Sequence, residues 1–370
     1  MSASKVLVTG ADGFIGRNLT LRLSELGHRP IPIVRTSDAQ ALQDGVAQAD
    51  IVVHLAGANR PVNPDEFMAV NRGACETLID ALEKAGRRLP VILTSSVRAD
   101  DPSDYGRSKL SGEEVIRAYG DSADVPVHIF RLPNVFGKWC RPYYNSAVAT
   151  FCHRIARDIP IEIHDPDAPL TLVYIDDVVA AFVAIIENGA AAGFHTVEPT
   201  YESSVGAVAE TLNGFAHTRE TGRIDRVGVG LKRALYATYV AAIPPDRFSY
   251  AVTMHRDARG SFAEMLKTLD SGQFSVFTAL PGVTRGGHYH HTKTEKFLIV
   301  HGRARFRFRH MVSGERYELE TDSDDFRIVE TVPGWAHDVT NIGDELMISL
   351  LWANEAFDPA HPDTIAVQGL

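Results

Sequence analysis

The sequence predicts two domains of different class, a doubly wound parallel α/β sheet followed by an all-β domain. Up to about residue 214, apolar runs with a β-branched bias alternate with stretches of helical periodicity, and this alternation indicates βαβ units. After Gly230 comes one more apolar helical piece, 231–243, and then only short strands separated by turns. We therefore expect the domains to be 1–245 and 246–370.

The expected strands and helices of the first domain alternate without interruption. Lys5–Thr9 is an apolar run, and apolar residues then recur at near-helical spacing from Phe14 until Gly27, which offers a helix stop. The elements expected next are a strand at 31–34, a short helical piece, a strand at 51–55, a helix at 65–85, a strand at 91–94, a helix from about 104 and a strand at 127–131.

The second domain is expected to consist of short strands. They are predicted at 250–253, 262–265, 274–279, 296–300, 304–308, 317–319, 326–330 and 346–351. Turn signals such as Pro281-Gly282 and Pro333-Gly334 lie between them. Many short strands with no helix among them predict a barrel or a jelly roll.

Composition limits the class of protein. The 370 residues are 45% apolar and 23% charged, as in ordinary globular proteins, and the net charge of -10 leaves no basic surplus for nucleic acid. No apolar run approaches the ~20 residues that span a bilayer, and the first residues lack a signal-peptide core. The cysteines Cys75, Cys140 and Cys152 are scattered and odd in number, which fits a reducing compartment. We expect a cytoplasmic protein without nucleic-acid or membrane partners.

Glycines follow the first expected strand at a regular spacing. Gly10, Gly13 and Gly16 come directly after it and open the first expected helix. Backbone amides at a helix N-terminus can face a pyrophosphate, and glycine lets that group approach the backbone. A lone glycine pattern is a weak signal, but this position favours a dinucleotide-binding turn.

Histidines gather near the far end of the chain. His288 and His290 are one residue apart on an expected strand, so their side chains point to the same side. Glu295 can return to that point from the next strand, and His337 follows a Pro-Gly turn. Three imidazoles and a carboxylate predict a divalent-metal site with room for an exchangeable ligand. The alternative is a set of surface histidines, but the flanking apolar run 297–300 favours a buried position.

The first domain resembles the extended short-chain dehydrogenase/reductase family, whose fold is Rossmann-like, over roughly the first 215 residues. The resemblance is carried by Gly10-x-x-Gly13-x-x-Gly16, His54-Leu55-Ala56-Gly57, Val70-Asn71, Thr94-Ser95-Ser96, Tyr105-x-x-x-Lys109, Arg131-Leu132-Pro133-Asn134-Val135-Phe136-Gly137 and Tyr174-Ile175-Asp176-Asp177-Val178. It implies that Ser96, Tyr105 and Lys109 are catalytic. The cofactor site would comprise Gly10, Gly13, Phe14, Ile15, Gly16, Arg35, Leu55, Ala56, Gly57, Asn71, Lys109 and Leu132.

The implied reaction needs these residue types. A hydride that reaches a carbonyl carbon leaves an alkoxide, which Tyr105 can protonate. Lys109, one helical turn further on, is expected to lower the pKa of Tyr105, and Ser96 to hydrogen-bond the same carbonyl. Tyr105 comes only nine positions after Ser96, which is closer than is usual in the family. The substrate pocket is therefore open or completed by another segment.

The second expected strand suggests which cofactor is used. It ends in Val34-Arg35-Thr36-Ser37, where NAD-binding relatives usually carry an acidic residue. Arg35 and the nearby hydroxyls favour a 2′-phosphate, and so NADPH over NADH. The alternative is that Arg35 is simply a solvated surface charge.

The second domain resembles the cupin family, which has a jelly-roll fold. The pattern His288-x-His290-x₄-Glu295-x₆-Gly302, followed by Pro333-Gly334-x₂-His337-x₃-Asn341, matches both halves of the cupin signature. The ligands implied are His288, His290, Glu295 and His337. Zinc is our first choice for the one divalent metal per chain, and iron, manganese or nickel also suit these ligands.

A finer likeness within the cupins is to dTDP-sugar epimerases. It is carried by Asp257-Ala258-Arg259-Gly260-Ser261-Phe262-Ala263-Glu264, Arg285-Gly286-Gly287-His288 and Lys296-Phe297-Leu298. The likeness implies that Arg259 holds a nucleotide diphosphate and that Lys296 is catalytic, because it stabilises an enolate. The base for epimerisation stays open among His288, Tyr289, His291, Lys293 and Asp338.

Over essentially the whole chain, the order of the domains resembles the bifunctional capsular polysaccharide synthesis enzymes. This resemblance implies that the cupin epimerises C3 of a UDP-2-acetamido-2,6-dideoxy-4-keto-hexose. The first domain would then reduce the C4 ketone with NADPH, giving UDP-2-acetamido-2,6-dideoxy-L-talose on the path to UDP-N-acetyl-L-fucosamine. The family also implies a homodimer that takes a UDP-linked amino-sugar.

Three alternatives remain. The chain can be a reductase whose cupin serves only dimerisation or metal sensing. It can be a dehydratase or C4 epimerase, although those relatives carry acidic residues where Val97-Arg98 stands. A non-catalytic binding protein requires that Ser96, Tyr105 and Lys109 coincide by chance.

Overall fold

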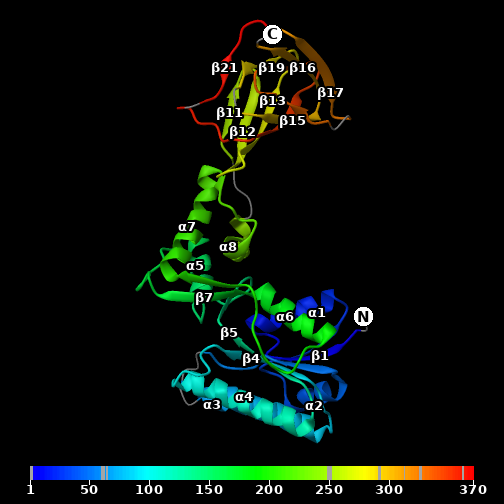
Figure 1. The fold of residues 1–370 in the computed structure, drawn as a ribbon, viewed down its shortest axis with the longest axis vertical. Helices are drawn as coiled ribbons and strands as arrows, with labels where there is room; N and C mark the ends of the chain where they lie inside the picture. Colours follow the sequence, from blue (N-terminus) through cyan, green and yellow to red (C-terminus); the bar gives the residue numbers. More distant parts are fainter. Residues whose placement is uncertain are drawn as a thin grey trace. The chain divides into compact units, whose positions relative to one another are not determined.

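The computed structural model describes residues 3–59, 63, 66–247, 252–290, 293–311, 313–324, 327–360 and 362–370. The chain forms two compact units (Figure 1), Met1–Leu212 with Gly230–Pro244 and Asn213–Val229 with Pro245–Leu370. Segment 213–229, which the sequence pattern groups with the first domain, clusters with the second unit because a strand in it pairs there.

A six-stranded parallel sheet forms the centre of the first unit. Its strands, in spatial order, are β2 (Arg29–Ile33), β1 (Lys5–Thr9), β3 (Ile51–His54), β4 (Val91–Ser96), β5 (Val127–Leu132) and β8 (Gly193–His195). Val6, Leu7 and Val8 of β1 have no exposed surface. Because helices cover both faces of a parallel sheet, its central strands are continuous apolar runs.

Helices cover both faces of this sheet (Figure 1), with α1 and α6 on one face and α2, α3 and α4 on the other. The helices are α1 (Phe14–Glu25), α2 (Ala39–Gln48), α3 (Glu66–Lys84), α4 (Asp104–Ala123), α5 (Ala147–Ile155), α6 (Ile175–Asn188), α7 (Val205–Thr221) and α8 (Gly230–Ala241). A smaller sheet contains β6 (Asn134–Phe136), β7 (Pro169–Tyr174) and β9 (Thr200–Ser204). Among the described residues, no helix is both long and apolar enough to cross a bilayer.

Two largely antiparallel sheets form the second unit. One contains β10 (Arg223–Ile224), β11 (Met254–Asp257), β12 (Gly260–Thr268), β13 (Gln273–Ala279), β20 (Met347–Ala353), β15 (Glu295–His301) and β18 (Val329–Glu330). The other contains β17 (Arg316–Asp322), β16 (Arg303–His310), β19 (Trp335–Asn341), β14 (Thr284–Tyr289) and β21 (Ile365–Ala366). The turn η1 (Pro245–Arg247) precedes them. Phe277, Phe297 and Phe306 belong to their shared core.

The predicted fold class is confirmed, with a Rossmann-like parallel sheet first and antiparallel sheets second. Some expected bounds fall outside the described residues, and one strand was not predicted. The strand predicted at 250–253 lies partly outside the described residues, and β11 begins only at Met254. Asp65 and Phe326, where a helix and a strand were expected to begin, also lie outside them. Strand β19 was missed, although it carries His337.

Candidate active sites

The glycine turn between β1 and α1 is too crowded for other residues. Gly10 has a φ of +66°, and a Cβ added there would lie 2.9 Å from the amide nitrogen of Ala56. A Cβ on Gly16 would lie 2.3 Å from the carbonyl oxygen of Gly10. Gly13 is the N-cap of α1 and supplies no side-chain cap, so the first amides of the helix remain available to an anion. This geometry fits a pyrophosphate.

Thr9 and His54 hold the neighbouring loop in place. Thr9 Oγ1 accepts hydrogen bonds from the amides of Leu55 and Ala56, both at 3.2 Å. Because both lone pairs are then occupied, its own proton is donated to His54 Nδ1, 2.8 Å away. Neutral His54 therefore carries its proton on Nε2, a buried atom without a partner among the described residues. Burial and the charge of Lys109 lower the pKa of His54 to about 4.

Asn71 links the loop after β3 to helix α4, which carries Tyr105 and Lys109. Its amide nitrogen donates to Ser108 Oγ (2.9 Å), and its Oδ1 accepts from the amide of Ala58 (2.9 Å). A Cβ on Gly57 would lie 2.7 Å from Asn71 Oδ1 and 3.1 Å from Lys109 Nζ. Glycine at this position therefore lets the loop, Asn71 and Lys109 meet.

Two other predicted cofactor residues lie at the ends of strands in the same sheet. Arg35 is exposed just beyond β2, and no ion pair joins it to another described residue. Leu132 is buried at the end of β5, opposite Ser96 of β4 in register. The first observation fits a cation that is available to a phosphate, and the second places Leu132 beside a predicted catalytic residue.

Ser96, Tyr105 and Lys109 come together at the end of β4 and the start of α4. Ser96 is buried at the last position of β4, and Tyr105 lies in the first turn of α4. Lys109 Nζ lies 5.9 Å from the centroid of the Tyr105 ring. Tyr105 Oη also donates a 3.4 Å hydrogen bond to Asn59 Oδ1. The arrangement suits proton donation to a carbonyl oxygen.

The pKa of Tyr105 is raised, so the predicted depression by Lys109 is wrong for the chain as it stands. Burial is the main cause, and it outweighs the hydrogen bond with Ser96 and the positive charge of Arg98. Desolvation also lowers the pKa of Lys109. Tyr105 is therefore protonated near neutral pH, as a proton donor in a reduction must be, although a donor works best when its pKa lies nearer the working pH.

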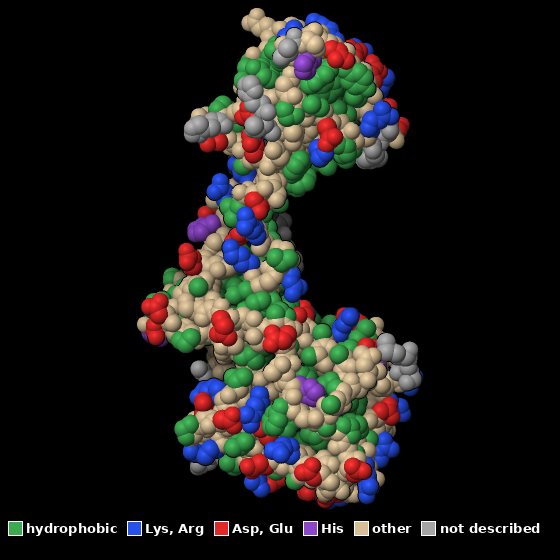
Figure 2. Space-filling model, viewed as in Figure 1, with side chains coloured by type: hydrophobic (Ala, Val, Ile, Leu, Met, Phe, Trp, Pro, Cys, Tyr) green, Lys and Arg blue, Asp and Glu red, His purple; other side chains and the backbone are tan. Residues whose placement is uncertain are grey.

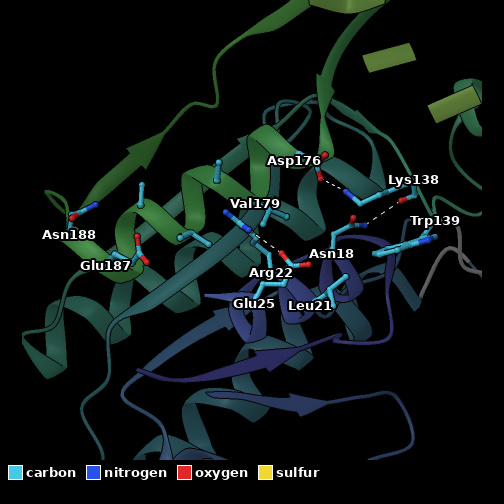
Figure 3. A pocket seen from close by; sticks show the side chains of 13 residues that line it. Asn18, Leu21, Arg22, Glu25, Lys138, Trp139, Asp176, Val179, Glu187 and Asn188 are labelled. Atoms are coloured by element: carbon cyan, nitrogen blue, oxygen red, sulfur yellow. Dashed lines mark hydrogen bonds and ion pairs between the residues drawn. The ribbon is translucent and has the colours of Figure 1, made fainter. Parts of the chain in front are cut away.

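A surface pocket of about 520 Å³ lies between α1 and α6 (Figure 3). Lys138 and Trp139 line one end of it, where Lys138 forms an ion pair with Asp176. Glu187 and Asn188 lie at the other end. None of its lining residues is among the predicted catalytic or cofactor residues.

In the second unit, His288, His290, Glu295 and His337 form one cluster. Their potential ligand atoms all lie within 4.8 Å of one another. The glycine pair at 286–287 has φ values of 93° and 80° and accompanies a register shift, after which His288 stands opposite His337. A side chain at Gly286 would approach the carbonyl oxygen of His337 to 3.0 Å. The bulge therefore sets the register of the cluster.

The chemistry of this cluster fits a cation. The Nδ1 atoms of His290 and His337 face backbone carbonyl oxygens of Asp363 (2.6 Å) and Trp335 (3.5 Å). Carbonyls only accept, so in the neutral rings both Nε2 atoms carry lone pairs. These atoms lie 3.2 and 3.3 Å from Glu295 Oε2. Three acceptors that converge in a buried place require a positive charge among them.

The pKa values in this cluster also suit metal ligands. Burial opposes ionisation of Glu295, but the neighbouring His290 and His337 hold its pKa below the usual range. Burial and the neighbouring His337 lower the pKa of His288 to about 4. A carboxylate and a neutral imidazole are the forms that bind a divalent metal.

Lys296 lies next to Glu295 but faces away from this cluster, and its catalytic role stays a prediction. It follows Glu295 on β15, and adjacent residues of a strand point to opposite faces. Its side chain is 44% exposed and forms an ion pair with Glu330. Lys293 is the buried lysine here: its Nζ donates to Thr364 Oγ1 (3.0 Å), and its charge acts on His288.

The proposed bases differ in their placement. Asp338 is buried and forms a bidentate ion pair with Arg307, at 3.0 and 2.6 Å. Since it follows His337 on β19, its side chain points to the other face of the sheet. Tyr289 is the last residue of β14 and lies between His288 and His290, which both belong to the cluster. His291 lies outside the described residues.

The second unit also contains two arginines, Arg259 and Arg285, that affect each other. Arg259 forms an ion pair with Asp257, which lowers the pKa of that carboxyl to about 2. Arg285 Nη1 donates to the carbonyl of Thr278 (2.8 Å), and its guanidinium lies 5.2 Å from the Phe277 ring centroid. Burial and the charge of Arg259 lower the pKa of Arg285. Two neighbouring positive charges that act on each other suit an anionic ligand.

Sequence reasoning missed several residues of these sites. His54 was treated only as part of a loop motif, although a histidine that ends an apolar strand signals a buried polar contact. Asp363 and Thr364, which contact His290 and Lys293, are about 70 positions away in the chain. No local pattern connects them to the cluster.

Comparison with known proteins assigns both units. Residues 6–197 match the model of the NAD dependent epimerase/dehydratase family, and residues 255–365 match the polysaccharide biosynthesis C-terminal domain. The UDP-2-acetamido-2,6-beta-L-arabino-hexul-4-ose reductase of Pseudomonas aeruginosa is 53% identical over 364 residues, which cover 98% of each chain.

Solved structures show the same architecture. The capsular polysaccharide assembling protein CapF of Staphylococcus aureus superposes with a TM-score of 0.92 and 38% identity, covering 98% of this chain and 100% of that one. RMD of Pseudomonas aeruginosa, solved with NADPH, aligns with 65% of this chain and 99% of that chain. At 20% identity and a TM-score of 0.55, this second likeness concerns the fold alone.

Proposed function

The chain belongs to the NAD dependent epimerase/dehydratase family and shares the full two-domain architecture of CapF, and from this premise we propose that it is a bifunctional nucleotide-sugar enzyme. Its substrate is a UDP-2-acetamido-2,6-dideoxy-4-keto-hexose. Residues 246–370 invert C3, and residues 1–245 then reduce the C4 ketone with NADPH. The product is UDP-2-acetamido-2,6-dideoxy-L-talose, on the path to UDP-N-acetyl-L-fucosamine in capsule or O-antigen synthesis.

The meeting of Ser96, Tyr105 and Lys109 beside a crowded glycine turn carries the reductase half of the proposal. When bound, NADPH supplies a hydride to the carbonyl carbon. Tyr105 gives its proton to the oxygen, and Ser96 hydrogen-bonds the same oxygen and orients it. Arg35 binds the 2′-phosphate, which selects NADPH over NADH.

The buried His and Glu cluster supports the epimerase half. Removal of a proton beside a ketone places negative charge on the ketone oxygen, and a bound divalent ion, zinc by our choice, supplies a Lewis acid there. His288, His290, Glu295 and His337 would hold it. We assign to Lys293 the stabilising positive charge that the sequence had suggested for Lys296.

The charged residues at 257–285 support a nucleotide subsite. Arg259 and Arg285 would bind the diphosphate of the substrate, since guanidinium groups match phosphate oxygens. The aromatic core keeps Arg285 in place through Phe277. We also propose that the enzyme acts as a homodimer. Light scattering of the purified protein gives its molar mass in solution and so tests this state.

Product analysis tests this function. The purified protein is incubated with the UDP-4-keto sugar and NADPH, NADPH oxidation is followed by absorbance, and the product is identified by NMR. We expect stoichiometric NADPH oxidation and a sugar with inverted C3 and a hydroxyl at C4. Reduction without inversion would favour a reductase whose second domain has another role.

A further inference from the structure

Arg131, near the end of β5, joins segments that carry the proposed catalytic residues. Its Nε and Nη2 donate to Glu113 Oε1 and Oε2 at 3.0 and 2.8 Å, and its Nη1 donates to Asp100 Oδ2 at 2.7 Å. The Phe194 ring centroid lies 4.8 Å from its Cζ. Every nitrogen of the guanidinium is engaged, so its orientation is fixed.

Glu113 is the buried centre of this network. It lies on α4 one turn beyond Lys109 and is 1% exposed. Its carboxylate also accepts a hydrogen bond from Ser95, the residue before Ser96 on β4. A buried carboxylate is stable only when it is paired and hydrogen-bonded. These contacts therefore define one arrangement of β4, β5 and α4.

Asp100 belongs to the short segment 97–103, which connects β4 to α4. This segment lies tightly against the first turn of α4, because a Cβ on Gly106 would lie 2.4 Å from the carbonyl oxygen of Asp101 and 2.5 Å from that of Arg98. The path of the segment thus determines how the end of β4 faces the start of α4.

We propose that Arg131 and Asp100 are positioning residues that hold segment 97–103 so that the hydroxyls of Ser96 and Tyr105 face the same carbonyl oxygen. The inference rests on the proposed reductase function. It explains how Ser96 and Tyr105, only nine positions apart, form one site. Arg131 acts through its partners Glu113 and Asp100.

The solvent exposure of the Asp100–Arg131 ion pair indicates that its loss changes the position of the segment more than the stability of the fold. The Asp100 side chain is 71% exposed and that of Arg131 is 26% exposed. Exposed ion pairs contribute little to folding stability. Removal of the Asp100 charge is therefore expected to alter the geometry of the segment while the fold persists.

The test uses Asp100→Asn in the full-length protein, with Asp104→Asn as the matched control. Asp104 forms a similarly exposed ion pair, with Arg107 of the same helix. We expect Asp100→Asn to lower kcat for reduction about tenfold, with the Kd for NADPH and the melting temperature unchanged. Amide hydrogen exchange of segment 97–103 should be faster than in the control. Asp100→Glu should restore most of kcat.

Two results overturn the proposal. One is a kcat within twofold of the wild type together with unchanged hydrogen exchange in segment 97–103. The other is a parallel loss of kcat, NADPH affinity and melting temperature, which a purely structural role produces. If the wild type does not oxidise NADPH with the keto sugar, the proposed function fails. The exchange comparison with Asp104→Asn then still decides whether Asp100 holds the segment.

Discussion

The two candidate sites are built from opposite kinds of geometry. In the first unit, a glycine turn and one helix bring most functional groups together within short stretches, and Tyr105 and Lys109 are one helical turn apart. In the second unit, the groups come from strands, and β14 and β19 contribute His288 and His337 from positions 49 residues apart. Helical spacing identifies neighbours directly, whereas a strand also requires that the correct face be known.

This difference predicts which changes separate the two proposed activities. The largest effect is expected for Tyr105→Phe, which removes the proton donor and should lower the rate of NADPH oxidation about 10²- to 10⁴-fold. Proton exchange at C3 in the second unit should continue at the wild-type rate. Stopped-flow absorbance and NMR measure the two steps. Loss of both steps together would show that the sites are not independent.

Two lysines, Lys293 before strand β15 and Lys296 on it, test which positive charge acts at the proposed epimerase site. Lys293→Met should slow C3 exchange about 100-fold, because a positive charge beside the developing oxyanion is lost. Lys296→Met is the matched control and should stay within about twofold of the wild type, since its side chain is exposed beside Glu330. The reverse order would restore the role that the sequence suggested for Lys296.

Arg35→Ala tests cofactor selection in the first unit. We expect the Kd for NADPH to rise about tenfold, because a charge-assisted hydrogen bond to the 2′-phosphate is lost. The Kd for NADH should remain within about twofold. Fluorescence titration of both cofactors gives the ratio. An equal change for the two cofactors would mean that Arg35 contacts no phosphate.

His54 predicts an effect on stability against pH rather than on either reaction. Burial and Lys109 lower its pKa from 6.5 to about 4 in the folded state. The unfolded chain therefore takes up a proton between these values that the folded chain does not, so stability is complete above pH 6.5 and falls toward pH 4. The loss is at most ~3 kcal/mol.

Urea unfolding at pH 7 and pH 4.5 measures this loss. His54→Asn should reduce the difference between the two pH values, and His164→Asn, at an exposed position, should leave it unchanged. An equal pH dependence in wild type and His54→Asn would show that another group is responsible.

Much of the first site could be predicted from the sequence because its contacts are local. The glycine turn needs three glycines at a fixed spacing, and a side chain on any of them would meet nearby backbone. The raised pKa of Tyr105 could not be predicted, since it depends on burial rather than on spacing. His54 was missed for the same reason.

The second site shows the limit of transferring motifs to strands. His288, His290 and Glu295 gather as the alternation predicts. The transferred motif did not take into account that Lys296, as the neighbour of Glu295 on the same strand, faces the other way. Lys293 was predicted only as one of several candidate bases. Its contact with Asp363 was not predicted, because the C-terminal segment folds back across about 70 residues to reach Lys293.

The central claim is that the second unit inverts C3 before reduction and independently of it. The most direct measurement incubates the protein with the UDP-4-keto sugar in deuterium oxide without NADPH and follows C3 by NMR. We predict deuterium at C3 in wild type and in Tyr105→Phe, and its absence after chelation or in Glu295→Gln. A wild-type protein that leaves C3 undeuterated while it oxidises NADPH with the same sugar would contradict the account.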